Sequence, residues 1–186
     1  MKILIRNSDN VVIYAQDDIN LTAPGTFGDG WQDYNFTTFN ATLDDVDLLP
    51  PLWSGAVWTY ISGSWAIADQ IRYNQILTEF KSTEIAKAYA NCKAILDEQS
   101  AGYSSVEIAA WPVMQTEVIG YNSSNTVGPT MQAIIARGRH TAESLSAMLT
   151  PKIAAQNAAL QERDSRVELI TGLSDPTAVA EYLATV

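Results

Sequence analysis

The sequence contains a single cysteine, Cys92, and a single histidine, His140. One cysteine excludes an internal disulfide and leaves the redox compartment open. One residue of each type is also too few for a zinc site, which usually takes four such ligands. Cys92 falls on the apolar positions of a predicted helix, which favours a small buried thiol over a nucleophile. His140 stands just before a predicted helix cap, where we expect a solvated or capping side chain.

Short motifs of common enzyme chemistry are also missing: there is no GxSxG, GxGxxG or GxxxxGK[ST]. Asp44, Asp45 and Asp47, with Asp17–Asp18, could offer oxygen ligands to calcium, but their spacing lacks the EF-hand pattern and favours a solvated loop. A polysaccharide hydrolase needs paired carboxylates across a cleft, and these aspartates are too local to supply them. We therefore predict that the protein is not an enzyme and has no catalytic, cofactor-binding or metal-binding residues.

Long apolar runs and basic residues are scarce as well. No window reaches the roughly 18 apolar residues of a membrane span, and no basic start precedes an apolar run, so we expect neither a span nor a signal peptide. The chain has 11 Lys+Arg against 21 Asp+Glu, a net charge of −10, and residues 1–70 alone carry two basic and nine acidic groups, a net of −7. An acidic surface repels phosphate, which argues against nucleic acid as a partner. The charge fits simple solubility or, alternatively, an acidic face directed at a basic partner.

The residues that are present describe a folded protein with a β-rich start. With 47% hydrophobic and 17% charged residues over 186 positions, the chain can bury a core. Residues 2–6 and 11–15 are rich in β-branched side chains and flank the turn-forming Asn7–Asn10, which predicts a hairpin. Residues 56–61 and 64–68 predict a second hairpin around Ser62–Gly63. Between the hairpins, prolines and glycines limit the chain to one or two short strands within loops.

Four tryptophans in this β region are candidates for a partner interface: Trp31, Trp53, Trp58 and Trp65. Tryptophan and tyrosine supply large rigid contact areas at binding surfaces, but they also fill small β cores, and both interpretations stay open. Trp53 is the most interface-like because it follows a proline pair in a predicted loop. Trp58, Tyr60 and Trp65 are expected to be cross-strand neighbours.

From Asp69 onward the apolar spacing becomes helical. A helix that ends near Gly102 is either a core helix or a spacer. Ser104 and Glu107 fit a capping box, and Pro112 then either starts a new helix or kinks this one. Three further helices are predicted: a short one at 131–137 ended by Gly138, a long one from Thr141 to about Thr171 with a kink or break at Pro151, and a final one after Asp175–Pro176. The predicted fold is therefore α+β: a small antiparallel N-terminal β domain (1–68), a long connecting helix (69–102) and a C-terminal helical domain (103–186).

The residue pattern of 103–171 resembles that of the C-terminal domain of tail fibre assembly and accessory proteins of tailed bacteriophages. The residues that carry the resemblance are Tyr103, Glu107, Ile108, Trp111, Pro112, Gln115, Glu117, Pro129–Thr130, the stretch 134–138 and Lys152–Ile153. One departure is Val118–Ile119–Gly120, where the family often carries a second acidic residue and alanines. The N-terminal third is similar, more loosely, to leader domains of small phage tail accessory proteins.

The resemblance implies a chaperone-like protein that helps to fold or cap a tail fibre, and it brings no catalytic residues. The implied partner is a trimeric phage tail fibre protein, met in the host cytoplasm during assembly, with retention on the virion tail as a further implication. Such a partner would cover strand edges and apolar ends that fibre chains expose while they assemble. The alternative is a receptor-binding tip protein whose tryptophans stack on host-surface sugars.

Overall fold

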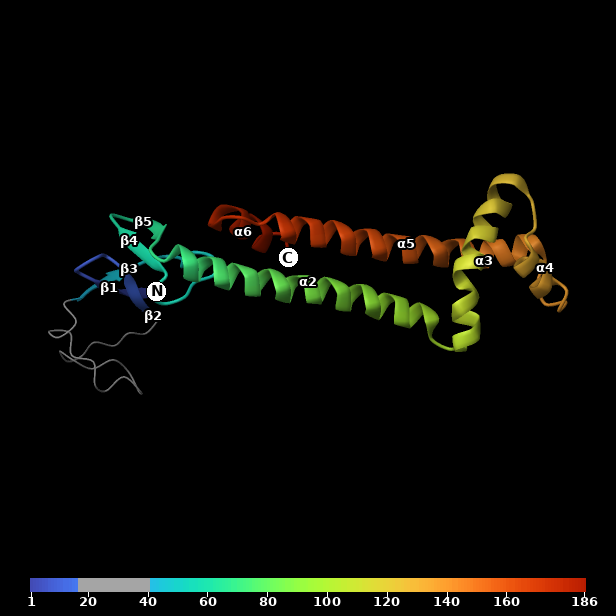
Figure 1. Cartoon of the computed structure of the whole chain (residues 1–186), viewed down its shortest axis with the longest axis horizontal. Coiled ribbons are helices and arrows are strands. Elements are labelled where there is room, and N and C mark those ends of the chain that lie inside the picture. The colour runs from blue at the N-terminus through green and yellow to red at the C-terminus, as the bar shows by residue number, and fades with distance from the viewer. Residues whose placement is uncertain (17–40) are drawn as a thin grey trace. The chain divides into compact units, whose positions relative to one another are not determined.

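The computed structural model describes residues 1–16 and 41–186. Its elements follow the predicted order, strands first and helices after, which confirms the α+β class (Figure 1). By contacts the chain divides into two compact units: unit 1 holds Met1–Ser82 and Gly172–Val186, and unit 2 holds Thr83–Thr171. In the part of the chain that the structure describes, no helix is long and apolar enough to cross a membrane.

Unit 1 is built on a three-stranded antiparallel sheet with β1 (Lys2–Arg6) in the centre. β1 pairs with β2 (Val12–Gln16) on one side and with β3 (Ala41–Asp45) on the other. The first predicted hairpin is thereby confirmed. Its turn places Asn10 in the left-handed region, with φ of 59°, a conformation that asparagine tolerates better than most residues.

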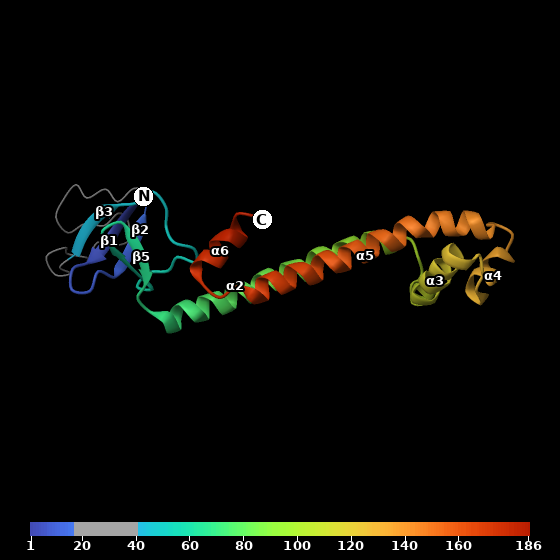
Figure 2. The ribbon, with the colours of Figure 1, turned by 90° about the horizontal axis from the view of Figure 1, so that it is seen from above.

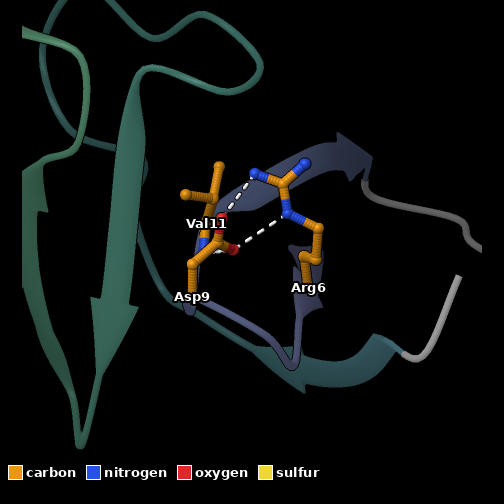
Figure 3. A network of polar contacts seen from close by, with 3 residues as sticks. All are labelled: Arg6, Asp9 and Val11. Carbon is orange, nitrogen blue, oxygen red and sulfur yellow. Dashed lines mark hydrogen bonds and ion pairs between the residues drawn. The ribbon is translucent and has the colours of Figure 1, made fainter.

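An ionic contact closes this first turn (Figure 3). The Asp9 carboxylate accepts hydrogen bonds from Arg6 Nε at 2.9 Å and Arg6 Nη2 at 2.6 Å, and Oδ1 also accepts from the Val11 amide at 3.3 Å. The hydrogen bond from Arg6 lowers the pKa of Asp9 below its ordinary value. These groups are local in sequence and favour the turn, and the Tyr60 amide adds a hydrogen bond to the Asn10 carbonyl at 3.1 Å from the second hairpin.

The second predicted hairpin is also present, as β4 (Trp58–Ile61) and β5 (Ser64–Ile67). Tyr60 lies opposite Trp65 in the register, as expected, whereas Trp58 lies opposite Ile67. An isolated β-bridge between Val11 and Thr59 and a hydrogen bond from the Tyr60 amide to the Asn10 carbonyl at 3.1 Å link this hairpin to the first.

The core of unit 1 draws on segments from both ends of the chain. Ile3, Val12 and Val57 are fully buried. α2 (Gln70–Ser100) adds buried side chains from its first turns, and α6 (Pro176–Leu183) adds Val179 and Tyr182. The rings of Phe80 and Tyr182 meet edge to face, with centroids 6.0 Å apart.

These contacts explain why the C-terminal residues belong to the same compact unit as the strands. The division by contacts therefore differs from the ranges 1–68, 69–102 and 103–186. It does not test which ranges fold as independent domains, and those ranges stay a prediction.

Unit 2 contains α3 (Ser105–Ser124), α4 (Pro129–Ile135) and nearly all of α5 (Ala142–Gly172). Its apolar centre consists of Met114, Val118, Met131 and Leu145. In both views, the unit 2 part of α2 runs beside α5 (Figure 1 and Figure 2).

The predicted helix starts at Ser104, Thr141 and Asp175 are confirmed by their capping side chains, whereas the short helix predicted at 131–137 is found at Pro129–Ile135. The capping box of Ser104 and Glu107 is complete, Thr141 Oγ1 accepts the Ser144 amide at 3.2 Å, and Asp175 accepts the Ala178 amide at 3.0 Å. Neither internal proline ends its helix: α3 continues through Pro112 and α5 through Pro151. This excludes a new helix at Pro112 and a break at Pro151.

Candidate functional site

A small hollow in unit 2 brings together residues that are distant in the sequence. It has a volume of about 50 Å³ and lies among the end of α2, α3 and α5. We call it the Tyr103 hollow. Its aromatic and polar walls are formed by Gln99, Tyr103, Trp111, Gln115, Lys152 and Gln156.

The centre of the Tyr103 hollow is a contact of three side chains. The rings of Tyr103 and Trp111 meet edge to face with centroids 5.3 Å apart, and Lys152 Nζ donates a hydrogen bond to Tyr103 Oη at 2.6 Å. Nζ also lies 4.9 Å from the Tyr103 ring centroid. Because Nζ sits beside the hydroxyl, at the rim of the ring, we interpret this approach as a hydrogen bond rather than a cation–π contact.

Amide side chains supply the remaining hydrogen-bonding groups. Gln115 Nε2 donates to Asn157 Oδ1 at 3.1 Å. Gln99 Oε1 is buried and has no hydrogen-bond partner among the described residues, so it could accept a bond from an incoming N–H group. The volume holds roughly one or two water molecules. The hollow therefore suits an inserted protein side chain rather than a cofactor.

Several residues that carry the resemblance line this hollow: Tyr103, Trp111, Gln115, Lys152 and Ile153. The sequence alone did not indicate them as a site, since Pro112 was interpreted only as the start of a new helix or a kink. The available signal was that the motif residues are polar and aromatic as well as apolar. The fold was needed to bring Tyr103 next to Lys152, 49 positions away.

Glu117, another of these residues, performs a structural task in the same unit. Its carboxylate accepts the backbone amides of Thr130 at 3.0 Å and Met131 at 2.7 Å, at the N-terminus of α4. The N-cap residue Gly128 has no side chain to do this, and a Cβ there would lie 2.4 Å from Glu117. Burial raises the pKa of Glu117, but the amides of Met131 and Thr130 lower it, and the net pKa is below the ordinary value.

A second candidate site is the aromatic cluster of unit 1, formed by Trp53, Tyr60 and Trp65. Trp53 and Trp65 meet with ring centroids 5.9 Å apart, and Tyr60 and Trp65 with centroids 4.8 Å apart. All three are half-buried and pack against the sheet core. Each ring therefore has one side fixed by the fold and another available to a partner.

A third predicted interface residue, Trp58, does not belong to the aromatic cluster. Trp58 is only 2% exposed and packs edge to face on Tyr73, with centroids 5.5 Å apart, so it belongs to the core. Trp31 lies outside the described residues. Which of the four tryptophans contacts a partner stays a prediction.

Acidic groups flank the sheet without forming a site. Asp44, Asp45 and Asp47 are exposed, and the described residues contain no group of three or more His, Cys, Asp or Glu side chains that could hold a metal ion. Asp17–Asp18 lie outside the described residues. Cys92 is buried on α2, as predicted, and His140 is half-buried.

Comparisons with known proteins do not assign this chain to a family. No family model matches it, and searches of the curated proteins and of the solved structures gave no significant match.

Proposed function

We propose that this protein is an accessory or assembly factor for a bacteriophage tail fibre, and that it acts by binding the fibre chain without catalysing a reaction. Binding would cover apolar ends and strand edges of the fibre during folding, or cap the finished fibre on the virion. The implied partner is a trimeric tail fibre protein, met in the host cytoplasm.

The observation that carries this proposal is the convergence of the resembling residues in unit 2. Tyr103, Trp111, Gln115 and Lys152 span 50 positions of sequence yet meet around one hollow. Glu107 and Glu117, from the same pattern, cap α3 and α4. Residues of one sequence pattern therefore line a shared hollow and cap two helices of the same unit.

A binding role is further supported by the aromatic cluster. Three half-buried rings on a strongly acidic N-terminal region offer the rigid contact area that interfaces use most. Leu48 and Ile61, close by in sequence to Trp53 and Tyr60, are 80% and 53% exposed. An apolar surface beside exposed aspartates suits a partner that is itself apolar and basic.

Co-expression with a long tail fibre chain tests the proposal. We expect a stoichiometric complex on a sizing column and fibre that stays insoluble or unassembled when the accessory chain is omitted. Trp53→Ala and Lys152→Ala would ask which unit binds, with Ile71→Ala as a control because that side chain is 75% exposed and outside both candidate sites. Fibre that folds unaided and elutes separately would refute the proposal.

The alternative, a tip protein that binds host-surface sugar, draws on the half-buried Trp53–Trp65 pair, since aromatic faces stack on sugar rings. It predicts that Trp53→Ala abolishes phage adsorption while fibres still assemble. Missing fibres in the same variant would instead favour the assembly role.

A further inference from the structure

A second, much larger hollow in unit 2 is a surface feature that neither candidate site explains. It lies between α2 and α5 and has a volume of about 530 Å³. Small and apolar side chains line it: Ala88, Cys92, Ile95, Ala155, Ala158 and Ala159. We call it the alanine groove. The hollow is open to solvent, so α2 and α5 leave between them a groove on the surface of unit 2 that another chain can fill.

Two charged groups at the alanine groove, Arg166 and Glu98, have no ion-pair partner among the described residues. Arg166 lines it, and its Nε is buried with no hydrogen-bond partner among the described residues. The nearby Arg163 is already paired with Asp164 at 2.6 Å. Glu98 continues the face of Asn91 and Ile95 by helical spacing, is exposed, and forms no ion pair with any described residue.

Arg166 and Glu98 lie at similar distances along the helices from the middle of the groove, in opposite directions. Arg163 lies 5.2 Å from the ring of Tyr89, and Ile95 and Ala155 line the same hollow, so α2 and α5 are antiparallel with Cys92 near Ala159. At 1.5 Å per residue, Arg166 lies about 10 Å from Ala159 toward one end, and Glu98 about 9 Å from Cys92 toward the other.

We propose that a second copy of this chain packs antiparallel on the alanine groove, so that unit 2 of each copy supplies two helices to a four-helix bundle. The two-fold axis is perpendicular to the helices and passes near Cys92. The helices of the second copy therefore run in the opposite direction, and its Glu98 lies at the same position along the bundle as Arg166 of the first copy. The interface is then self-complementary, with an Arg166–Glu98 pair at each end and Ile95 side chains filling the space above the alanines.

A two-fold axis parallel to the helices would instead give poorer charge complementarity between the two copies. Arg166 would then meet the part of α2 near Glu84, which is buried and already bound by Lys87 at 2.6 Å. The antiparallel arrangement also places the two Cys92 thiols close to the axis, on facing α2 helices. The two Arg166–Glu98 pairs stand about 19 Å apart along the helices, a short face that suits an interface at the lower end of the stable size range, for which we expect a micromolar Kd.

Sedimentation of the purified full-length chain, without any fibre protein, tests the proposal. We expect a reversible monomer–dimer equilibrium with a Kd below about 100 µM. Glu98→Arg should weaken it at least tenfold, and the swap Glu98→Arg/Arg166→Glu should restore most of the affinity. Glu168→Arg, an equal charge change two positions from Arg166 and off the face, is the matched control.

One further measurement keeps the test independent of any folding defect. Ala158→Trp should fill the groove and abolish the dimer while helicity by circular dichroism is unchanged, because Ala158 is exposed. A chain that stays monomeric throughout this range would overturn the proposal, as would a dimer that Glu98→Arg and the control weaken equally. The fibre-binding proposal does not depend on either result.

Discussion

Unit 1 and the alanine groove of unit 2 differ in how completely they bury their apolar side chains. In unit 1, strands from the start of the chain, the first turns of α2 and the final helix meet, and Ile3, Val57, Tyr73 and Val179 lose all solvent exposure. In the alanine groove, in contrast, the lining residue Ile95 stays 42% exposed, and Tyr89, whose ring lies 5.2 Å from the lining residue Arg163, stays 51% exposed. A closed core stabilises the chain that contains it, whereas an open face is typical of a surface completed by a partner.

The largest effect that would break this comparison is expected at Trp58. Trp58→Ala removes a side chain that is 2% exposed and packed on Tyr73, and we expect a loss of about 3–5 kcal/mol in the free energy of unfolding. Trp53→Ala, which removes the same side chain from a half-buried position, should cost less than half as much. Urea titration followed by circular dichroism measures both, and equal losses would show that the two tryptophans are not core and surface residues.

The difference between these two tryptophans also marks what the sequence could predict. Both hairpins were predictable because Asn7–Asn10 and Ser62–Gly63 act locally, and the helix starts because Ser104, Thr141 and Asp175 cap within one turn. Burial of Trp58 depends on Tyr73, from a helix that begins after the hairpin, and local patterns do not contain that contact.

The candidate site was less predictable than the fold for the same reason. Tyr103 meets Lys152, and Glu117 meets the amides of Thr130 and Met131, only after α3, α4 and α5 have packed. The grouping of α6 with the strands likewise requires the contact between Phe80 and Tyr182.

Within unit 2 the closed part can be tested at Glu117 and Gly128. Glu117→Ala leaves two α4 amides without their acceptor and should cost about 1–2 kcal/mol of unfolding free energy. Gly128→Ala should cost a similar amount, because its Cβ would displace the Glu117 carboxylate. In a Glu117→Ala background the Gly128 substitution should cost much less, and additive losses in this double-mutant cycle would contradict the contact.

The same carboxylate predicts a pH dependence. The pKa of Glu117 is lower in the folded state than its ordinary value of 4.5, so the folded state favours the ionised form. Its stabilising contribution is therefore complete above pH 4.5 and is lost as the pH falls through the lowered folded pKa. Urea titrations across this acidic range should show a steeper loss for the native chain than for Glu117→Gln, and identical pH profiles would contradict this assignment.

A smaller effect of opposite sign is expected at Tyr73, whose hydroxyl is buried without a hydrogen-bond partner among the described residues. Tyr73→Phe keeps the edge-to-face contact with Trp58 and removes an unsatisfied polar group, so the free energy of unfolding should rise by about 1 kcal/mol. Thermal unfolding checks the direction. A clear loss of stability would mean that a buried water or a residue outside the described ranges satisfies the hydroxyl.

The smallest effect on stability is expected in the alanine groove. A substitution there distinguishes an effect on folding from an effect on association. Ile95→Ala truncates a side chain that is 42% exposed, so the dilute monomer should lose less than about 0.5 kcal/mol of unfolding free energy. The same variant should weaken self-association several-fold, because in the dimer Ile95 fills the space above the alanines of the other copy. Urea titration at low concentration and sedimentation at high concentration measure the two quantities on one sample.

Ile71→Ala, on the same helix but within unit 1 and 75% exposed, should change neither monomer stability nor self-association. A large loss of monomer stability in Ile95→Ala with unchanged association would place Ile95 in a closed core and remove the contrast between the two regions.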